Sequence, residues 1–93
     1  MDIVADNHNF QIKMELFKGE PYIHCEMHLW SHGLYKKYLK VLHDLKVHLK
    51  EQGFTKMYTA LKKTDTKGIK FNNMFGFEQV DETETQVILS QEL

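Results

Sequence analysis

The sequence contains few of the residues that cross-link or interrupt a chain. Among its 93 residues there are one cysteine, Cys25, one proline and five glycines. A single cysteine cannot form an internal disulfide, and so little proline and glycine excludes collagen-like and linker-rich chains. Apolar residues occur in runs of two or three, far short of the roughly 20 that span a membrane. We therefore expect one small globular domain that does not associate with membranes.

Arginine is absent as well, so all twelve basic residues are lysine, set against 13 acidic ones. Residues 31–70 contain ten lysines and three acids, while the segments on either side are acidic. Lysine binds anions as a flexible point charge, which disfavours bidentate recognition of phosphate or guanine. A basic segment of this kind is compatible with nucleic-acid binding, but we favour an ordinary solvated lysine face.

The first residues do not resemble a secretion signal. Met1 is followed by Asp2, without the basic and then apolar stretch of such a signal. Together with the single cysteine, this predicts a reducing, cytoplasmic compartment. Residues 1–9 are expected to be a polar lead-in, and residues 10–93 to form the domain.

The first half of the domain shows a change from strand to helix periodicity. Residues 10–17 and 22–29 alternate between apolar and polar side chains, which predicts an antiparallel hairpin. Over residues 34–51 the apolar side chains follow helical spacing, which predicts a long amphipathic helix. Ser31 is its expected N-cap, and Gly53 its expected end.

The second half predicts a strand, a short helix and two further strands. Residues 54–61 are apolar on both faces, as expected for a central strand that pairs in parallel with the hairpin. Thr64 or Asp65 can cap a helix that runs to Phe75. Terminal strands are expected at residues 77–80 and 85–90, on either side of an acidic turn. The fold class is therefore α/β (α+β), with the order β-β-α-β-α-β-β and a mixed sheet.

Histidine and cysteine residues lie close together at His24, Cys25, His28 and His32. His24 and His28 share a strand face, but four residues along a strand separate their Cα atoms by roughly 13 Å. Zinc needs its nitrogen ligands at about 2.0–2.1 Å. Cys25 is expected to point inward, where an apolar row raises the pKa of a thiol. We therefore predict no metal site and no Cys-His nucleophile pair.

The segment from Lys70 to Glu78, with the sequence KFNNMFGFE, carries a family resemblance. It resembles the last helix and following strand of the GCN5-related N-acetyltransferase (GNAT) superfamily, which ends in an aromatic residue, a few polar residues and Gly-Phe-Glu. The order of elements on both sides is similar as well. The resemblance covers roughly residues 10–91, the acyl-CoA-binding half of such a domain, without the N-terminal helices that usually help to cover the acceptor. It implies a GNAT-like fold, with acetyl-CoA as the one cofactor to be expected.

The resemblance also implies a pyrophosphate-binding loop at the start of the long helix. The matching cofactor-binding residues are Ser31, His32, Gly33, Leu34, Tyr35 and Lys36. Gly33 can fill the first glycine position of the family's loop. Tyr35 occupies the second, where its side chain is expected to crowd an approaching phosphate, and the loop is short.

In the last helix, Asp65 and Asn72 match two positions that in the family often hold an Asn and a Tyr. The Tyr can act as general acid to the CoA thiolate, whereas an amide cannot supply that proton. An aspartate near the phosphates adds repulsion. The catalytic candidates therefore remain open, with His24 as a further candidate for the base. They are Glu26, His28, Tyr35 and Asn72.

Three functions follow from this reading. We favour a GNAT-like domain with lost or reduced acetyltransferase activity that binds a macromolecular partner, expected to be a protein, as in small phage or mobile-element products. The localisation would then be the host cytoplasm. The alternatives are an active miniature acetyl-CoA-dependent N-acetyltransferase and a small nucleic-acid-binding α/β module. A sheet built from this half alone exposes edges and one face, so a homo-oligomer is also expected.

Overall fold

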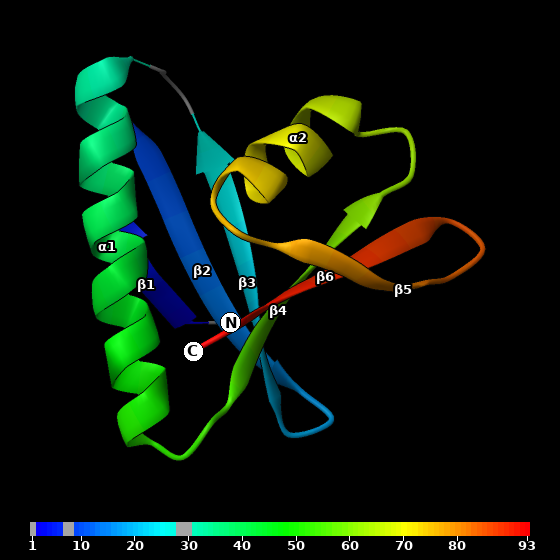
Figure 1. The fold of residues 1–93 in the computed structure, drawn as a ribbon, viewed down its shortest axis with the longest axis horizontal. Helices are drawn as coiled ribbons and strands as arrows, with labels where there is room; N and C mark the ends of the chain where they lie inside the picture. The colour runs from blue at the N-terminus through cyan, green and yellow to red at the C-terminus, as the bar shows by residue number, and fades with distance from the viewer. Residues whose placement is uncertain (1, 7–8, 28–30) are drawn as a thin grey trace.

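The computed structural model describes residues 2–6, 9–27 and 31–93. Six strands form one mixed sheet in the order β1-β2-β3-β4-β6-β5, and two helices pack against it (Figure 1). The elements are β1 (Asp2–Asp6), β2 (Phe10–Phe17), β3 (Glu20–Met27), α1 (His32–Glu51), β4 (Lys56–Lys62), α2 (Thr66–Met74), β5 (Glu78–Glu82) and β6 (Gln86–Glu92). The α/β fold class and the expected order after residue 10 are confirmed.

The first strand corrects the expectation that residues 1–9 are a lead-in outside the domain. Asp2–Asp6 pairs antiparallel with β2, with Ile3 opposite Lys13 and Asp6 opposite Gln11. A strand at the edge of a sheet is held by main-chain hydrogen bonds, which need no apolar pattern in the sequence. Its register also shifts between Ile3 and Ala5, and its five residues, DIVAD, do not alternate between apolar and polar side chains, so no strand periodicity could be detected.

The predicted hairpin is present, with a tighter turn than expected. β2 and β3 are antiparallel with Phe17 opposite Glu20, so the loop is only Lys18 and Gly19. Both residues have positive φ, 53° and 79°, as in a two-residue type I′ turn. Pro21 is therefore the second residue of β3 instead of part of the turn, a position near a strand start that tolerates a missing N–H.

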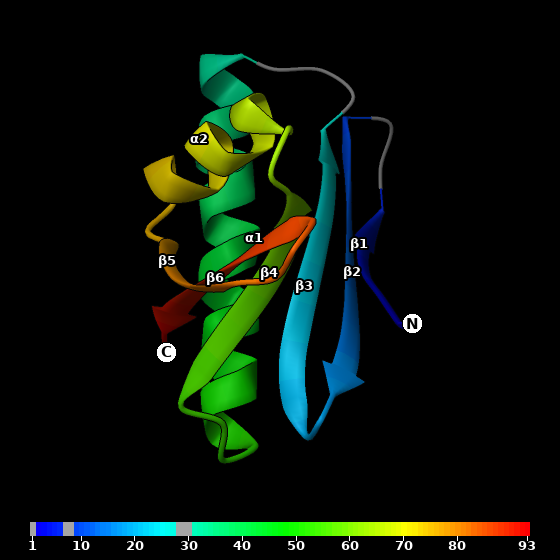
Figure 2. The ribbon, with the colours of Figure 1, turned by 90° about the vertical axis from the view of Figure 1, so that its right-hand side faces the viewer.

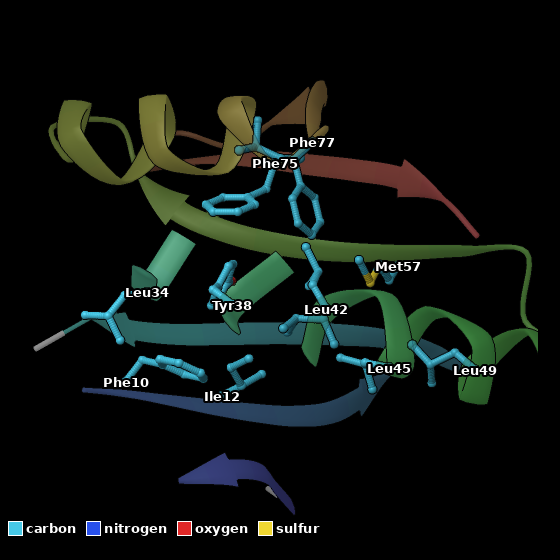
Figure 3. Close-up of a cluster of buried hydrophobic side chains, with 12 residues drawn as sticks. Phe10, Ile12, Leu34, Tyr38, Leu42, Leu45, Leu49, Met57, Phe75 and Phe77 are labelled. Carbon is cyan, nitrogen blue, oxygen red and sulfur yellow. The ribbon is translucent and has the colours of Figure 1, made fainter. Parts of the chain in front are cut away.

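The long helix α1 crosses one face of the sheet and joins β3 to β4. Its N-cap is Ser31, whose hydroxyl accepts a hydrogen bond from Leu34 N at 3.3 Å, and Gly53 follows its last turn at φ 94°. Both predicted ends are confirmed. The side chains that α1 buries form one stripe, drawn in Figure 3: Leu34, Tyr38, Leu42, Leu45 and Leu49.

This stripe packs on inward-facing residues of the sheet and on the end of α2, in one core cluster (Figure 3). The partners are Phe10, Ile12, Ile23, Met57, Phe75, Phe77 and Leu89. Both helices lie on this face (Figure 2). No helix in the described ranges covers the opposite face, and none of them is long and apolar enough to cross a membrane.

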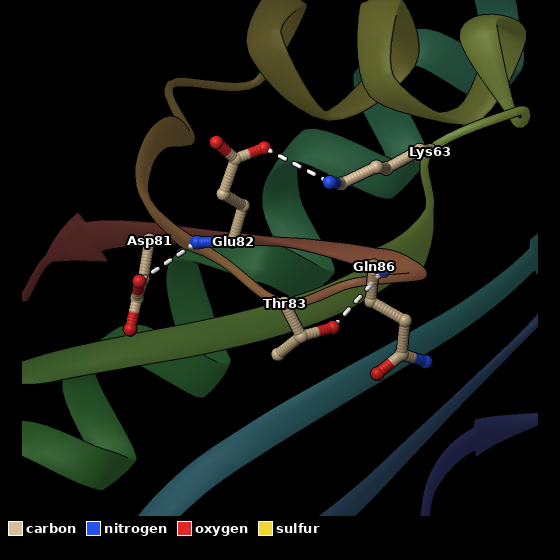
Figure 4. A network of polar contacts seen from close by, with 5 residues as sticks. All are labelled: Lys63, Asp81, Glu82, Thr83 and Gln86. Carbon is tan, nitrogen blue, oxygen red and sulfur yellow. Dashed lines mark hydrogen bonds and ion pairs between the residues drawn. The ribbon is translucent and has the colours of Figure 1, made fainter.

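The last strands are longer than predicted. β5 extends to Glu82 and β6 to Glu92, and β4 begins at Lys56, two residues later than expected. All five residues of β5 are exposed, so no apolar alternation marked its length. The turn is fixed by local polar bonds (Figure 4): the Thr83 hydroxyl accepts from Gln86 N at 3.1 Å, and Lys63 pairs with Glu82 at 3.2 Å.

Candidate functional site

The central strands β3 and β4 run parallel, and a single pair of residues is aligned between them. Tyr22 lies opposite Tyr58, early in both strands. Beyond this pair the strands diverge towards their carboxyl ends (Figure 1). Because α1 follows β3 and α2 follows β4, both helix N-termini border the place where the strands separate. Helix N-termini carry unpaired N–H groups and a partial positive charge that favour anions.

The start of α1 was predicted to hold a pyrophosphate. Ser31 and Gly33 are exposed there, and a Cβ placed on Gly33 would meet nothing closer than the Ser31 hydroxyl at 3.9 Å. The packing of the described residues therefore leaves room at Gly33. Leu34, in contrast, is a buried core residue, and Lys36 is exposed on the next turn. The side chain of His32 lies outside the described residues.

The ring of Tyr35 contacts the end of α2, which its place in the predicted loop did not indicate. Its ring is half-buried and stacks on Phe75, with 5.2 Å between centroids and 28° between planes. That Tyr35 crowds an incoming phosphate stays a prediction, while the ring itself packs against the end of α2. An aromatic partner across the helix layer decides its direction, and this contact is invisible in the local sequence.

Tyr35 belongs to an aromatic cluster between α1 and α2. At its centre Tyr38, 1% exposed, contacts Phe10, Phe71 and Phe75 at centroid distances of 5.6, 5.3 and 4.6 Å. Burial raises the pKa of the Tyr38 phenol, and hydrogen bonding to Cys25 acts in the same direction. Sequence reasoning placed Tyr38 in the apolar stripe but missed its partner on β3.

Cys25 is confirmed as an inward-facing structural residue. Burial raises the pKa of its thiol, an effect that the hydrogen bond to Tyr38 only partly opposes. A protonated thiol is a poor nucleophile. Cys25 and Tyr38 are therefore a mutually satisfied pair inside the core and not an acid–base pair that works near neutral pH.

Asp65 is the N-cap of α2. Its Oδ1 accepts a hydrogen bond from Gly68 N at 3.0 Å, and its carboxylate lies so close to Gly68 that a Cβ there would clash with it. The negative charge of the cap offsets the positive end of the helix dipole. The N-terminus of α2 is therefore already occupied by the chain's own anion.

Asn72 is buried, with 8% of its surface exposed. Its Nδ2 donates to the backbone carbonyl of Gly68 at 2.8 Å, one turn earlier in α2. Its backbone carbonyl accepts from Phe75 N and Phe77 N at the helix end. The side-chain amide nitrogen and the backbone carbonyl of Asn72 therefore both stabilise α2 and its C-terminal end.

The remaining candidates lie on the other face of the sheet. Ile23 and Cys25 point to the helices, so His24 and Glu26 alternate to the uncovered side of β3. His24 is 3.3 Å from Glu15 on β2, while Glu26 is exposed. His28 lies outside the described residues.

The sequence-predicted residues therefore do not form one constellation. His24 and Glu26 are separated by the sheet from Tyr35 and Asn72. Within residues 2–6, 9–27 and 31–93, no three His, Cys, Asp or Glu side chains are placed to share a metal ion.

Comparison with solved structures identifies the fold. The chain is similar to the PaiA N-acetyltransferase from Thermoplasma acidophilum, solved in complex with coenzyme A, with a TM-score of 0.72 and 14% identity. It is also similar to the ribosomal-protein-S18-alanine N-acetyltransferase from Escherichia coli, with a TM-score of 0.62 and 12% identity. No protein-family model and no curated protein sequence matches it.

Both similarities cover 90% of this chain, which spans 53% of the first protein and 61% of the second. This chain therefore has the fold of part of a GNAT domain, and the predicted GNAT-like architecture is confirmed.

Proposed function

We propose that this chain is a GNAT-fold domain in which acyl transfer is lost or reduced, and that it acts by binding a macromolecular partner, expected to be a protein. The hydrogen bond from Asn72 Nδ2 to the Gly68 carbonyl carries this proposal. It ties up the side chain that stands at the family's general-acid position, and an amide has no proton to give a thiolate at neutral pH.

Among the described residues, no neighbouring phenol is placed to take the role of Asn72. The nearest phenols on the helix side, Tyr35 and Tyr38, are packed into the aromatic cluster. Burial raises the pKa of Tyr38 further from neutrality, which weakens it as a proton donor. The cap formed by Asp65 adds a negative charge beside the place where the phosphates of an acyl-CoA would approach.

The described residues suit the pyrophosphate of acetyl-CoA, but Asn72 does not supply a general acid for its thiolate. Space above Gly33, at the N-terminus of α1, suits a pyrophosphate, and the exposed Lys36 lies one turn away. The family's general-acid position is held by Asn72, whose amide is bonded to Gly68 and has no proton to give a thiolate. Acetyl-CoA would supply an activated acetyl group when bound, but we derive no transfer step for this chain.

A second candidate is the active miniature N-acetyltransferase. The single registered pair of β3 and β4 favours it, because the divergence beyond Tyr22 and Tyr58 opens the sheet next to both helix N-termini. In that case Gly33 contacts the phosphates directly, and an aspartate in its place repels them.

Titration with acetyl-CoA separates the two functions. A ligand at 100 times its Kd adds about 2.7 kcal/mol of stability, which in a domain of this size raises Tm by about 10–20 °C. We expect no such shift at millimolar acetyl-CoA, and no acetylated product. Micromolar binding that Gly33→Asp abolishes, together with turnover, would overturn the proposed loss of activity.

A further inference from the structure

A groove of about 500 Å³ lies between α1, the end of α2 and β6. It is lined by Lys36, Leu39, Lys40, Leu42, His43, Lys46, Phe75 and Gln91. Only Lys36 among these belongs to the predicted pyrophosphate loop. The rest lie further along α1 or on other elements, so the groove is distinct from the α1 N-terminus.

The floor of the groove is apolar and firmly held. Leu42 and Phe75 belong to the buried core, and Phe75 is packed by Tyr35, Tyr38 and others of the aromatic cluster. The Gln91 amide donates to the Phe75 carbonyl at 2.9 Å, which joins β6 to the end of α2. Leu39 is 43% exposed at the edge of this floor. The groove therefore offers a rigid apolar surface to a partner's side chain.

The rim of the groove carries three lysines and one histidine. Lys36, Lys40, His43 and Lys46 follow one another at helical spacing on α1, over about 15 Å of helix. The ion pairs among the described residues are His24–Glu15 and Lys63–Glu82, so no carboxylate in that part of the chain pairs with this rim. An apolar floor beneath unpaired positive charge matches an anionic ligand with apolar side chains.

We propose that this groove binds an acidic peptide segment of a partner protein, in which carboxylates face the lysines and an apolar side chain covers Leu39. This deepens the proposed function, on which it rests, by stating the chemistry of the partner. The length of the rim corresponds to about five residues of extended peptide or about ten of helix.

The composition of the groove favours a peptide over nucleic acid. Single strands are held by exposed aromatic rings on which bases stack, whereas the one aromatic residue in the described lining of the groove, Phe75, is buried. The rim contains no arginine for bidentate contacts to phosphate or guanine.

Fluorescence anisotropy tests the proposal with a fluorescein-labelled peptide of about ten residues in which glutamates and leucines alternate. We expect saturable binding that weakens as salt rises, and at least about tenfold weaker binding to the double variant Lys36→Glu/Lys40→Glu. Lys37→Glu is the matched charge control, because Lys37 is exposed on α1 but does not line the groove. It should change the Kd by less than about twofold.

A second matched pair tests the apolar contact. Leu39→Gln should weaken binding several-fold, and Val47→Gln, on the same helix with 44% exposure but outside the groove, should not. Circular dichroism confirms that each variant is folded.

Four outcomes would overturn the proposal: no binding of the peptide, an equal loss in Lys37→Glu, equal binding of a polyglutamate peptide, or equally tight competition by an oligothymidylate. A concentration-dependent dimer that Lys36→Glu/Lys40→Glu disrupts would instead assign the groove to a second copy of this chain, and would overturn it too. Acetyl-CoA turnover, measured on the same samples, would overturn the proposed function and leave the peptide result standing.

Discussion

Tyr22 and Tyr58 stack with their ring centroids 5.3 Å apart and their planes at 20°. They are also the one registered pair between the parallel strands β3 and β4. Their rings lie on the face that no described helix covers, so the stack replaces the packing that a helix would give there. It holds the two strands together at the point from which they diverge.

Tyr58→Ala should therefore destabilise the domain by about 1–2 kcal/mol, because it removes the stack and part of its burial. Urea unfolding followed by circular dichroism measures the loss. Phe17 supplies the control, since its ring contacts Tyr22 edge-on at 5.5 Å but is 54% exposed. Phe17→Ala should cost less than about 1 kcal/mol, and equal losses in the two variants would contradict a special role for the stack.

The buried pair of Cys25 and Tyr38 predicts a loss of stability at high pH. Burial raises the pKa of Cys25 above its ordinary 9.0 and that of Tyr38 above 10.0. The unfolded chain therefore gives up these protons at lower pH than the folded chain, so the stabilisation is fully present below the unfolded pKa values and is lost as pH rises. We expect the free energy of unfolding to be level from about pH 7 to 8 and to fall above about pH 9.

Urea unfolding at a series of pH values measures this dependence. Cys25→Ala should remove the first part of the fall, because the thiol is the group with the lower ordinary pKa. Stability that increases between pH 9 and 10.5 would disagree with the sign of both shifts.

The cap of α2 predicts a difference between two replacements of Asp65. Asp65→Ala should cost about 1 kcal/mol, because Gly68 N loses its acceptor. Asp65→Asn keeps an acceptor oxygen and should retain most of the stability. Thermal unfolding compares the two variants, and an equal loss in both would mean that the charge, and not the hydrogen bond, stabilises the helix start.

The element order after residue 10 could be predicted because most of these elements have a local signature. The caps Ser31 and Asp65 act through their own side chains on N–H groups three residues away, and Gly53 and Gly76 adopt positive φ at the helix ends. The apolar stripe of α1 follows from helical spacing alone. β1 and β5 were missed or shortened because edge strands are held by main-chain pairing with a neighbour.

The candidate site could be predicted only in part. Matching positions to a family pointed to Gly33, Asp65 and Asn72, whose part in binding a ligand stays a prediction, and the chemistry of an amide and a carboxylate was readable from their names. The direction of Tyr35 was not readable, because it depends on Phe75, forty residues away. The lysine groove was hidden for the same reason, since its floor comes from three elements.

The sequence by itself determined the order of strands and helices, their caps, the buried face of α1 and the segregation of lysine from acid. These properties depend on neighbours within a few residues, which periodicity and backbone chemistry describe. Only the tertiary structure decided that Asp2–Asp6 joins the sheet, that Tyr35 turns to α2, and that four basic side chains border an apolar floor. Each of these depends on which atoms the folded chain brings together, and packing makes that choice among many that the same local pattern allows.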